Sequence, residues 1–150
     1  MHWQENLRLY IDFLKEKYGA TDAEIERMLT SVAIPAEAFA NELTPLQAAA
    51  HFLTKHHSKD VSACARILGR SPAEIEKFLS APAPSLPKTG SHFISAGTFA
   101  DRARSASEHL VFELEAQGLR VPDIARLLKK AEPTIWTLHY RNAKISEGGA

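Results

Sequence analysis

Two segments of the chain, Val61-Ser-Ala-Cys-Ala-Arg-Ile-Leu68 and Val121-Pro-Asp-Ile-Ala-Arg-Leu-Leu128, decide the fold. They lie sixty residues apart and share an Ala-Arg pair and the spacing of their apolar residues. In each segment the apolar residues recur at steps of three, one and three, which places them on one face of a helix. The same amphipathic helix is therefore predicted twice.

The repeat extends beyond these two helices. Ile34-Pro-Ala-Glu-Ala-Phe-Ala40 matches Ile94-Ser-Ala-Gly-Thr-Phe-Ala100 at the same offset, and Ile75 matches Ile135. Between these blocks, helices expected at 46–53 and 107–114 align better at an offset of sixty-one, which indicates a one-residue slip. Shared spacing over several blocks favours an internal repeat over two unrelated Ala- and Leu-rich helical stretches.

The last two helices of each half have the spacing of a helix-turn-helix. Two helices that cross steeply through a short turn need a small residue at their closest approach, which Ala65 and Ala125 supply. Gly69 gives the first turn its conformational freedom. Lys129 occupies the equivalent position and departs from this pattern, so a different conformation of the second turn remains an alternative. Apolar residues would hold the outer helix of each pair on the inner one: Ile75 and Phe78, and Ile135 and Leu138.

The rest of the chain also reads as helical, and no alternation at period two predicts a strand. Apolar residues from Trp3 to Tyr18 predict a first helix that ends at Gly19, and a second helix would include Ile25 and Leu29. Three prolines and a glycine in 81–91 exclude a helix there. We therefore expect an all-α protein with these parts: an N-terminal helical pair in 1–33, a first unit in 34–80, a linker in 81–91, a second unit in 92–144 and a flexible tail in 145–150.

Three further motifs carry a resemblance to a known family. They are an Ile-Pro-x-x-x-Phe lead-in at Ile34–Phe39, a helix start at Leu43-Thr-Pro-Leu-Gln47, and the stretch Thr134-Ile-Trp-Thr-Leu-His-Tyr-Arg141. The chain resembles the helix-turn-helix of sigma-factor region 4 and small related proteins, over 43–80 and 103–144. This resemblance implies DNA binding by the last helix of each unit. The first unit departs from it at Glu74-Ile-Glu-Lys-Phe78.

The second unit supplies most of the candidate DNA-binding residues. If the outer helix enters the major groove, Thr134 and Thr137 lie near base edges, and cationic side chains lie near phosphates. Trp136 either packs on the protein or stacks on the sugar-phosphate backbone. A merely solvated charged face is the alternative for the whole set. The candidates are Lys129, Lys130, Thr134, Thr137, Arg141 and Lys144.

The first unit offers fewer candidates, namely Arg70, Ser71 and Lys77. Glu74 and Glu76 on the same predicted helix would repel phosphates. Ser71 and Glu74, with a proline between them, also form a capping box, which gives both a structural role. Contact with DNA and contact with a protein therefore both remain open for this unit.

Composition excludes several other functions. The formal net charge is zero, but residues 119–150 hold six basic and three acidic side chains. A single cysteine, Cys64, forms no intrachain disulfide and is expected in the core rather than in a metal site with His51, His56 and His57. No nucleotide-binding or hydrolase motif occurs. We expect no catalytic residues, metal or cofactor, no membrane span or secretory signal, and a cytoplasmic, nucleoid-associated location.

The sequence thus favours a DNA-binding protein that acts as a transcriptional regulator or nucleoid-associated protein. Double-stranded DNA would be its partner, and self-association is open. The alternative is an assembly or adaptor protein that uses its helix-turn-helix units for protein contacts. The acidic first outer helix favours this alternative, as do the aromatic residues Trp3, Tyr10, Phe13 and Tyr18 near the N-terminus.

Overall fold

A computed structural model of the 150-residue chain describes residues 9, 12–13, 15–19, 21 and 32–148. The chain divides into two compact units, residues 1–31 (unit 1) and 32–150 (unit 2).

In unit 1, residues 9, 12–13 and 15–18 are helical. Gly19 adopts a positive φ of 63° and donates its N–H to Lys15 O, so the predicted end of the first helix is confirmed. The ring of Tyr18 packs edge-on against Phe13, with 5.9 Å between centroids. The other residues of the expected helical pair, including Trp3, Tyr10 and the whole second helix, lie outside the described residues.

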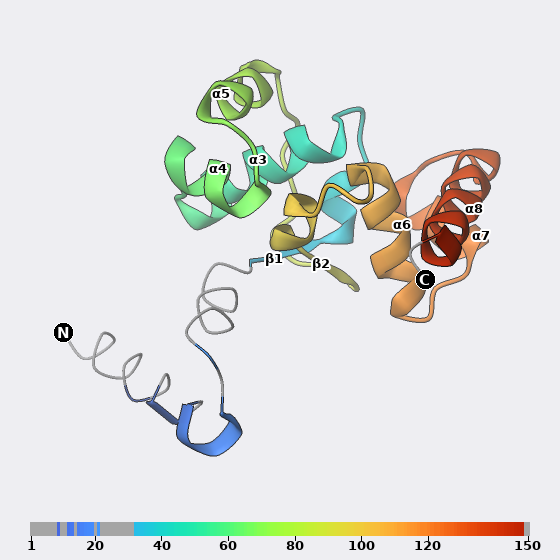
Figure 1. The fold of residues 1–150 in the computed structure, drawn as a ribbon. Helices are drawn as coiled ribbons and strands as arrows, with labels where there is room; N and C mark the ends of the chain where they lie inside the picture. Colours follow the sequence, from blue (N-terminus) through green and yellow to red (C-terminus); the bar gives the residue numbers. More distant parts are fainter. Residues whose placement is uncertain (1–8, 10–11, 14, 20, 22–31, 149–150) are drawn as a thin grey trace. The chain divides into compact units, whose positions relative to one another are not determined.

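Unit 2 is essentially all-α, as expected, with two matching series of elements (Figure 1). Each series begins with a short strand and a 3-10 turn and continues with three α-helices. The first series is β1 (Ala33–Pro35), η1 (Ala36–Phe39), α3 (Pro45–His57), α4 (Val61–Leu68) and α5 (Pro72–Ser80). The second is β2 (Phe93–Ser95), η2 (Ala96–Ala100), α6 (Ala106–Ala116), α7 (Val121–Leu128) and α8 (Glu132–Gly148).

Capping residues explain where several helices begin. Thr44 caps α3, Ser105 caps α6 and Ser71 caps α5, each in a reciprocal box with the residue three positions later. The box predicted at Ser71 and Glu74 is therefore confirmed. The caps of α3 and α6 are sixty-one residues apart, whereas α4 and α7 begin sixty apart, as the expected one-residue slip requires.

The two strands pair with each other, which the sequence did not predict, because three residues are too few to reveal a period of two. Ile34 lies opposite Ile94 in an antiparallel register, and both side chains are fully buried. These two residues are also equivalent in the repeat. Two outer hydrogen bonds, Ala36 N–H to His92 O and Ala96 N–H to Val32 O, are equivalent too, both at 2.8 Å. The repeats are therefore related by a local pseudo-twofold axis through this pair.

The lead-in segment of each half, which consists of β1 and η1 or of β2 and η2, also packs on the other half across this axis. The 3-10 turn η2 packs on α4 of the first half, and η1 packs on α7 of the second. Phe39 and Phe99, again equivalent, meet with ring centroids 6.0 Å apart. The predicted units 34–80 and 92–144 consequently share one core and do not form separate bodies.

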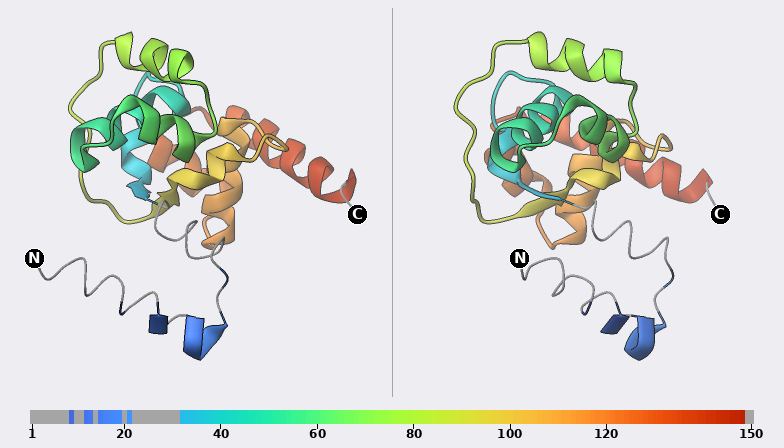
Figure 2. Two further views of the ribbon diagram at one scale, coloured as in Figure 1. Left: turned by 60° about the vertical axis from the view of Figure 1, so that its left-hand side comes forward. Right: turned by 90° about the vertical axis from the view of Figure 1, so that its left-hand side faces the viewer.

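The expected linker is free of helix but is held against the first half. Leu86 in this segment is only 5% exposed, and its carbonyl lies 3.0 Å from His56 Nε2. Figure 2 shows the segment running from α5 back to β2 along one side of unit 2. The flexible tail predicted for 145–150 is wrong over 145–148, where α8 continues, and residues 149–150 lie outside the described residues.

One contact breaks the pseudo-symmetry. Gly69, with φ of 63°, lies so close to the other half that a Cβ there would be 2.9 Å from Ala100 Cα. Its equivalent, Lys129, adopts nearly the same left-handed conformation, with φ of 54°, but carries a side chain. The α4–α5 turn therefore approaches the opposite lead-in more closely than a residue with a Cβ would allow.

We predict opposite effects on stability when these two residues are changed. Gly69→Ala should destabilise unit 2 by about 2 kcal/mol or more, because it combines left-handed strain with a clash against backbone. Lys129→Gly should stabilise it by up to about 1 kcal/mol by relieving the same strain. Urea unfolding of the full chain measures both. Equal stability of Gly69→Ala and the unmodified protein would contradict the close approach.

Candidate nucleic-acid interface

In each half, two successive helices are joined by a three-residue turn. The inner helices α4 and α7 pack on the outer helices α5 and α8. Ala65 and Ala125 are 8% and 7% exposed, as expected for small residues inside the corner. The carbonyl of Ala65 accepts a hydrogen bond from the N–H of Arg70 in the first turn. The carbonyl of Ala125 accepts one from the N–H of Lys130 in the second. The two turns have the same form, so Lys129 takes the role of glycine and the second turn does not differ.

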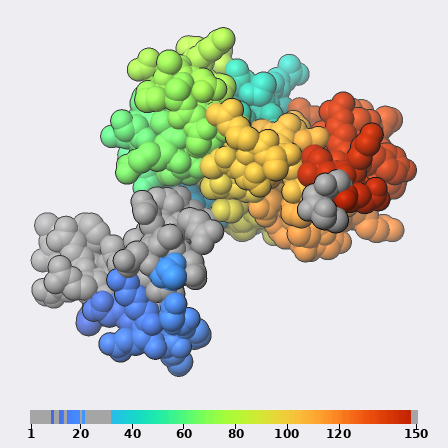
Figure 3. All heavy atoms as spheres, in the orientation of Figure 1, coloured from blue at the N-terminus to red at the C-terminus, as the bar shows by residue number. Residues whose placement is uncertain are grey.

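The outer helices α5 and α8 lie on two different sides of unit 2. Figures 1 and 2 show α5 and α8 apart from each other, and Figure 3 shows atoms of the red C-terminal part of the chain exposed on one side of unit 2. The helices also differ in length, because α5 ends at Ser80 whereas α8 continues beyond the equivalent residue, Tyr140, to Gly148.

Four of the predicted residues form a single stripe along α8. They follow each other at steps of three, four and three, so their side chains share one face of the helix. All four are exposed, and the face opposite them is anchored by the buried Ile135 and Asn142. This group, called the α8 stripe below, consists of Thr134, Thr137, Arg141 and Lys144.

The two lysines of the turn lie apart from this stripe. Lys130 is exposed but donates a hydrogen bond from Nζ to Asn41 O of the first half, at 2.9 Å. Lys129 is the left-handed residue that ends α7. Lys130 is thus part of the contact between the halves, and Lys129 ends a helix; sequence spacing indicated neither role.

The polar atoms of Thr137 and Trp136 are used within the helix. Thr137 Oγ1 donates to Pro133 O at 3.0 Å, and Trp136 Nε1 donates to Glu132 at 3.4 Å. Trp136 is 38% exposed and stacks on Tyr140, with 5.8 Å between ring centroids. It therefore lies on the surface beside the α8 stripe and does not pack in the core.

Asp123 on α7 reduces the basic excess of the C-terminal region. Its carboxylate lies 2.6 Å from a nitrogen of Arg126 and 3.7 Å from one of Arg120. A hydrogen bond from the Arg120 N–H is the main cause of a lowered pKa of Asp123, and the two guanidinium groups add to it. Arg120 and Arg126 are thus paired, and Arg141 and Lys144 provide the cationic charge of the α8 stripe.

In the first half, α5 presents a different surface. Arg70 turns inward and donates to the carbonyls of Leu68, Gly69 and Phe99 at 3.0–3.2 Å. The N–H and hydroxyl of Ser71 bind Glu74 and lower its pKa. Of the three candidates there, Lys77 is left exposed without such a contact, and exposed carboxylates accompany it at Glu74 and Glu76.

A polar cluster that the sequence analysis missed fixes the outer half of α8 on α6. Asn142, 5% exposed, donates to Glu108 O at 2.9 Å and accepts from Arg104 Nε at 3.1 Å. Arg104 also binds Ser146 Oγ at 3.0 Å and lies over the Phe112 ring. These residues are far apart in sequence, and only the buried position of Asn142 on an otherwise apolar face could have pointed to them.

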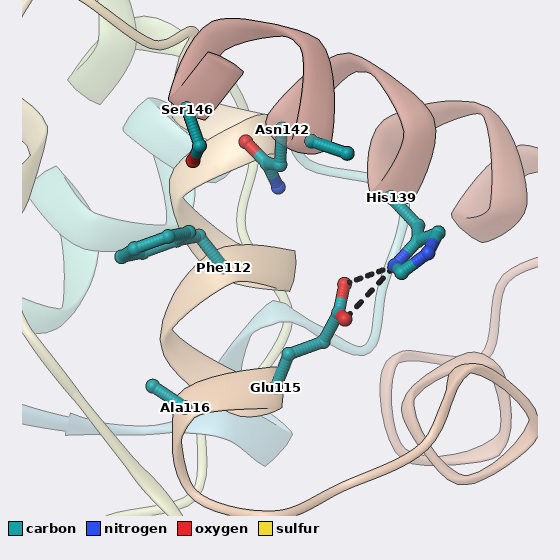
Figure 4. A pocket seen from close by; sticks show the side chains of 7 residues that line it. Phe112, Glu115, Ala116, His139, Asn142 and Ser146 are labelled. Atoms are coloured by element: carbon teal, nitrogen blue, oxygen red, sulfur yellow. Dashed lines mark hydrogen bonds and ion pairs between the residues drawn. The ribbon is translucent and has the colours of Figure 1, made fainter. Parts of the chain in front are cut away.

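A shallow cavity of about 320 Å³ lies beside this cluster, between α6 and α8. Figure 4 shows Glu115 and His139 across it, where Nδ1 of the imidazole lies 2.9 Å from a carboxylate oxygen. Phe112, 42% exposed, forms another part of the wall. The aromatic surface of Trp136 and Tyr140 continues from His139, whose ring contacts both.

The histidines and the cysteine do not form a metal site in the part of the chain that the structure describes. No group of three His, Cys, Asp or Glu side chains is placed to hold an ion there. Cys64 is fully buried, like its equivalent Ile124, and burial raises the pKa of its thiol. Over the same residues, no helix combines the length and apolar character needed to cross a membrane.

We predict that Asn142→Ala loosens the outer half of α8. The substitution leaves Glu108 O and Arg104 without their partner, which should cost about 1–3 kcal/mol. Hydrogen exchange should become faster at the amides of residues 140–147 and remain unchanged in α4. Lys144→Ala, on the exposed side of the same helix, is the control and should leave exchange unaffected. Unchanged protection in Asn142→Ala would show that the cluster does not hold the helix.

No family model matches the sequence, and the comparisons with curated proteins and with solved structures found no match.

Proposed function

We propose that the protein binds double-stranded DNA by inserting α8 into the major groove, as a transcriptional regulator or nucleoid-associated protein. The observation that carries the proposal is the α8 stripe, which is exposed on the outer helix of a helix-turn-helix corner. An α-helix fits the major groove, and the outer helix of such a corner is the element that enters it.

The chemistry of the stripe is compatible with this role. Arg141 and Lys144 can neutralise phosphates, and Arg141 can also donate two hydrogen bonds to guanine. Thr137 has its hydroxyl hydrogen engaged within the helix, so its methyl group is available for apolar contact with a thymine methyl. The stripe itself contains no carboxylate.

The binding surface is restricted to the second half in this proposal. On α5, Arg70 is bound to backbone carbonyls, Ser71 is a cap, and Glu74 and Glu76 would face the phosphates. The neutral net charge also predicts modest affinity for DNA away from the preferred site.

A second function, that of an assembly or adaptor protein, is favoured by a different observation. Trp136, Tyr140 and Phe112 are exposed on α8 and the adjoining helix α6. Aromatic side chains are enriched in the centres of protein interfaces. A partner protein that covers these rings would also cover the His139–Glu115 pair.

We expect the double variant Arg141→Glu, Lys144→Glu to lose binding to a random-sequence duplex. Each reversed side chain should remove one phosphate contact and lower the slope of log affinity against log salt by about 0.9. Fluorescence anisotropy at about 50 and 200 mM salt measures both quantities. Lys130 is left unchanged because it bonds to Asn41.

The matched control is Lys55→Glu, Arg66→Glu, which reverses two exposed cations of the first half and gives the same net charge. It should retain most of the affinity. An equal loss in both double variants would show that only total charge matters. Absence of salt-dependent binding in the unmodified protein would reject DNA binding and favour the adaptor function.

A further inference from the structure

A second cavity, of about 270 Å³, lies where the two halves of unit 2 meet at the base of α8. Its wall is built from the start of α3, from α6 and from the α7–α8 corner. Its deep part is apolar and consists of side chains that are at most 4% exposed. These are Phe39, Leu110, Val111, Leu128 and Ile135.

The mouth of this cavity is polar and carries both signs of charge. Glu42, Thr44, Lys130 and Thr134 line it and are exposed. Although both are described, Glu42 and Lys130 form no ion pair with each other, and Lys130 Nζ uses one of its three hydrogens on Asn41 O. The carboxylate of Glu42 and the remaining ammonium hydrogens are therefore available to a ligand.

The equivalent place in the other half carries two cations, because Arg102 and Arg70 are the equivalents of Glu42 and Lys130. There Gly69 lies against Ala100, and Arg102 donates to Gly69 O at 2.9 Å. Arg70, the equivalent of Lys130, reaches Phe99 O. Lys129 carries the Cβ that Gly69 lacks, so the second corner does not approach its lead-in in the same way. The mouth with two opposite charges is thus a feature in which the repeats differ.

We infer that this cavity binds a free α-amino acid with an apolar side chain of about the size of leucine or phenylalanine. The ammonium group would lie at Glu42, the carboxylate at Lys130, and the side chain among the apolar residues of the floor. An apolar cleft with a few convergent polar groups is the usual form of a small-molecule site. The volume is below that of sites for drug-sized ligands, which favours a small ligand.

The pair of opposite charges selects a zwitterion over other small molecules. A simple carboxylate would be attracted by Lys130 but repelled by Glu42. A simple amine would be attracted by Glu42 but repelled by Lys130. A neutral apolar molecule would gain from neither charged group. Bound ligand would contact Thr134, the first residue of the α8 stripe, although the inference does not depend on DNA binding.

Calorimetric titration of the full chain with L-leucine and L-phenylalanine tests this inference. We expect saturable binding of at least one of them, weakened about tenfold or more by Glu42→Gln and by Lys130→Met, since each removes one charge-assisted contact. 3-Phenylpropionate, which lacks the ammonium group, and 2-phenylethylamine, which lacks the carboxylate, should bind at least about tenfold more weakly than phenylalanine. Lys129→Met, in the same turn but outside the cavity, is the control and should bind as the unmodified protein does.

The position of the ligand is checked by NMR, where the amide signals of Thr134 and Leu138 should shift on titration and those of α5 should not. If Lys130→Met fails to fold, Glu42→Gln decides, because the exposed Glu42 side chain makes no hydrogen bond in the fold that the change would break. Three results would overturn the inference. They are no binding of either amino acid at millimolar concentration, binding of the two analogues as tight as that of phenylalanine, or an affinity that Glu42→Gln leaves unchanged.

Discussion

The pairing of Ile34 with Ile94 is the constraint on which the rest of unit 2 depends. Because the two residues are equivalent in the repeat and lie opposite each other in an antiparallel pair, they set a single twofold relation between the halves. Each lead-in is then directed to the other half, where η2 packs on α4 and η1 on α7. Neither half could complete its core alone, since Phe39 and Phe99 pack against each other between them. The proline-containing segment therefore connects parts of one core, and its own Leu86 is buried in that core.

Within this symmetric frame, the two corners have diverged in what they can contact. Gly69 permits close packing against Ala100, and Arg70 and Arg102 reinforce it by binding backbone carbonyls. Lys129 has a side chain in the equivalent place, and the second corner borders the cavity at the base of α8. The outer helices have diverged as well, because α8 is almost twice as long as α5, and its added part needs the Asn142 cluster to hold it. A buried amide with both of its groups satisfied fixes a helix in a single position more specifically than apolar contact alone.

The sequence predicts those features that depend on local spacing. Local spacing predicted the apolar periodicity around Ala65 and Ala125, the capping box at Ser71 and the one-residue slip before α6. The packing of each lead-in on the other half could not be predicted in this way, because a three-residue strand has no detectable period and its partner lies sixty residues away. The inward direction of Arg70 and the bond of Lys130 to Asn41 were missed for a related reason. Spacing along a helix tells which side chains share a face, but not which carbonyl of a distant segment lies within reach of a long cation.

The distribution of charge explains how a protein with no net charge can present a cationic surface. Asp123 pairs with Arg120 and Arg126, the carboxylates of α5 lie on the other half, and Glu132 and Glu147 of α8 are not members of the α8 stripe. At physiological salt, interactions between exposed charges are largely screened beyond about 8 Å. A phosphate at the stripe would therefore interact mainly with Arg141 and Lys144 and only weakly with the acidic residues elsewhere. The local arrangement of charge, and not the sum over the chain, determines which polyanion can approach this helix.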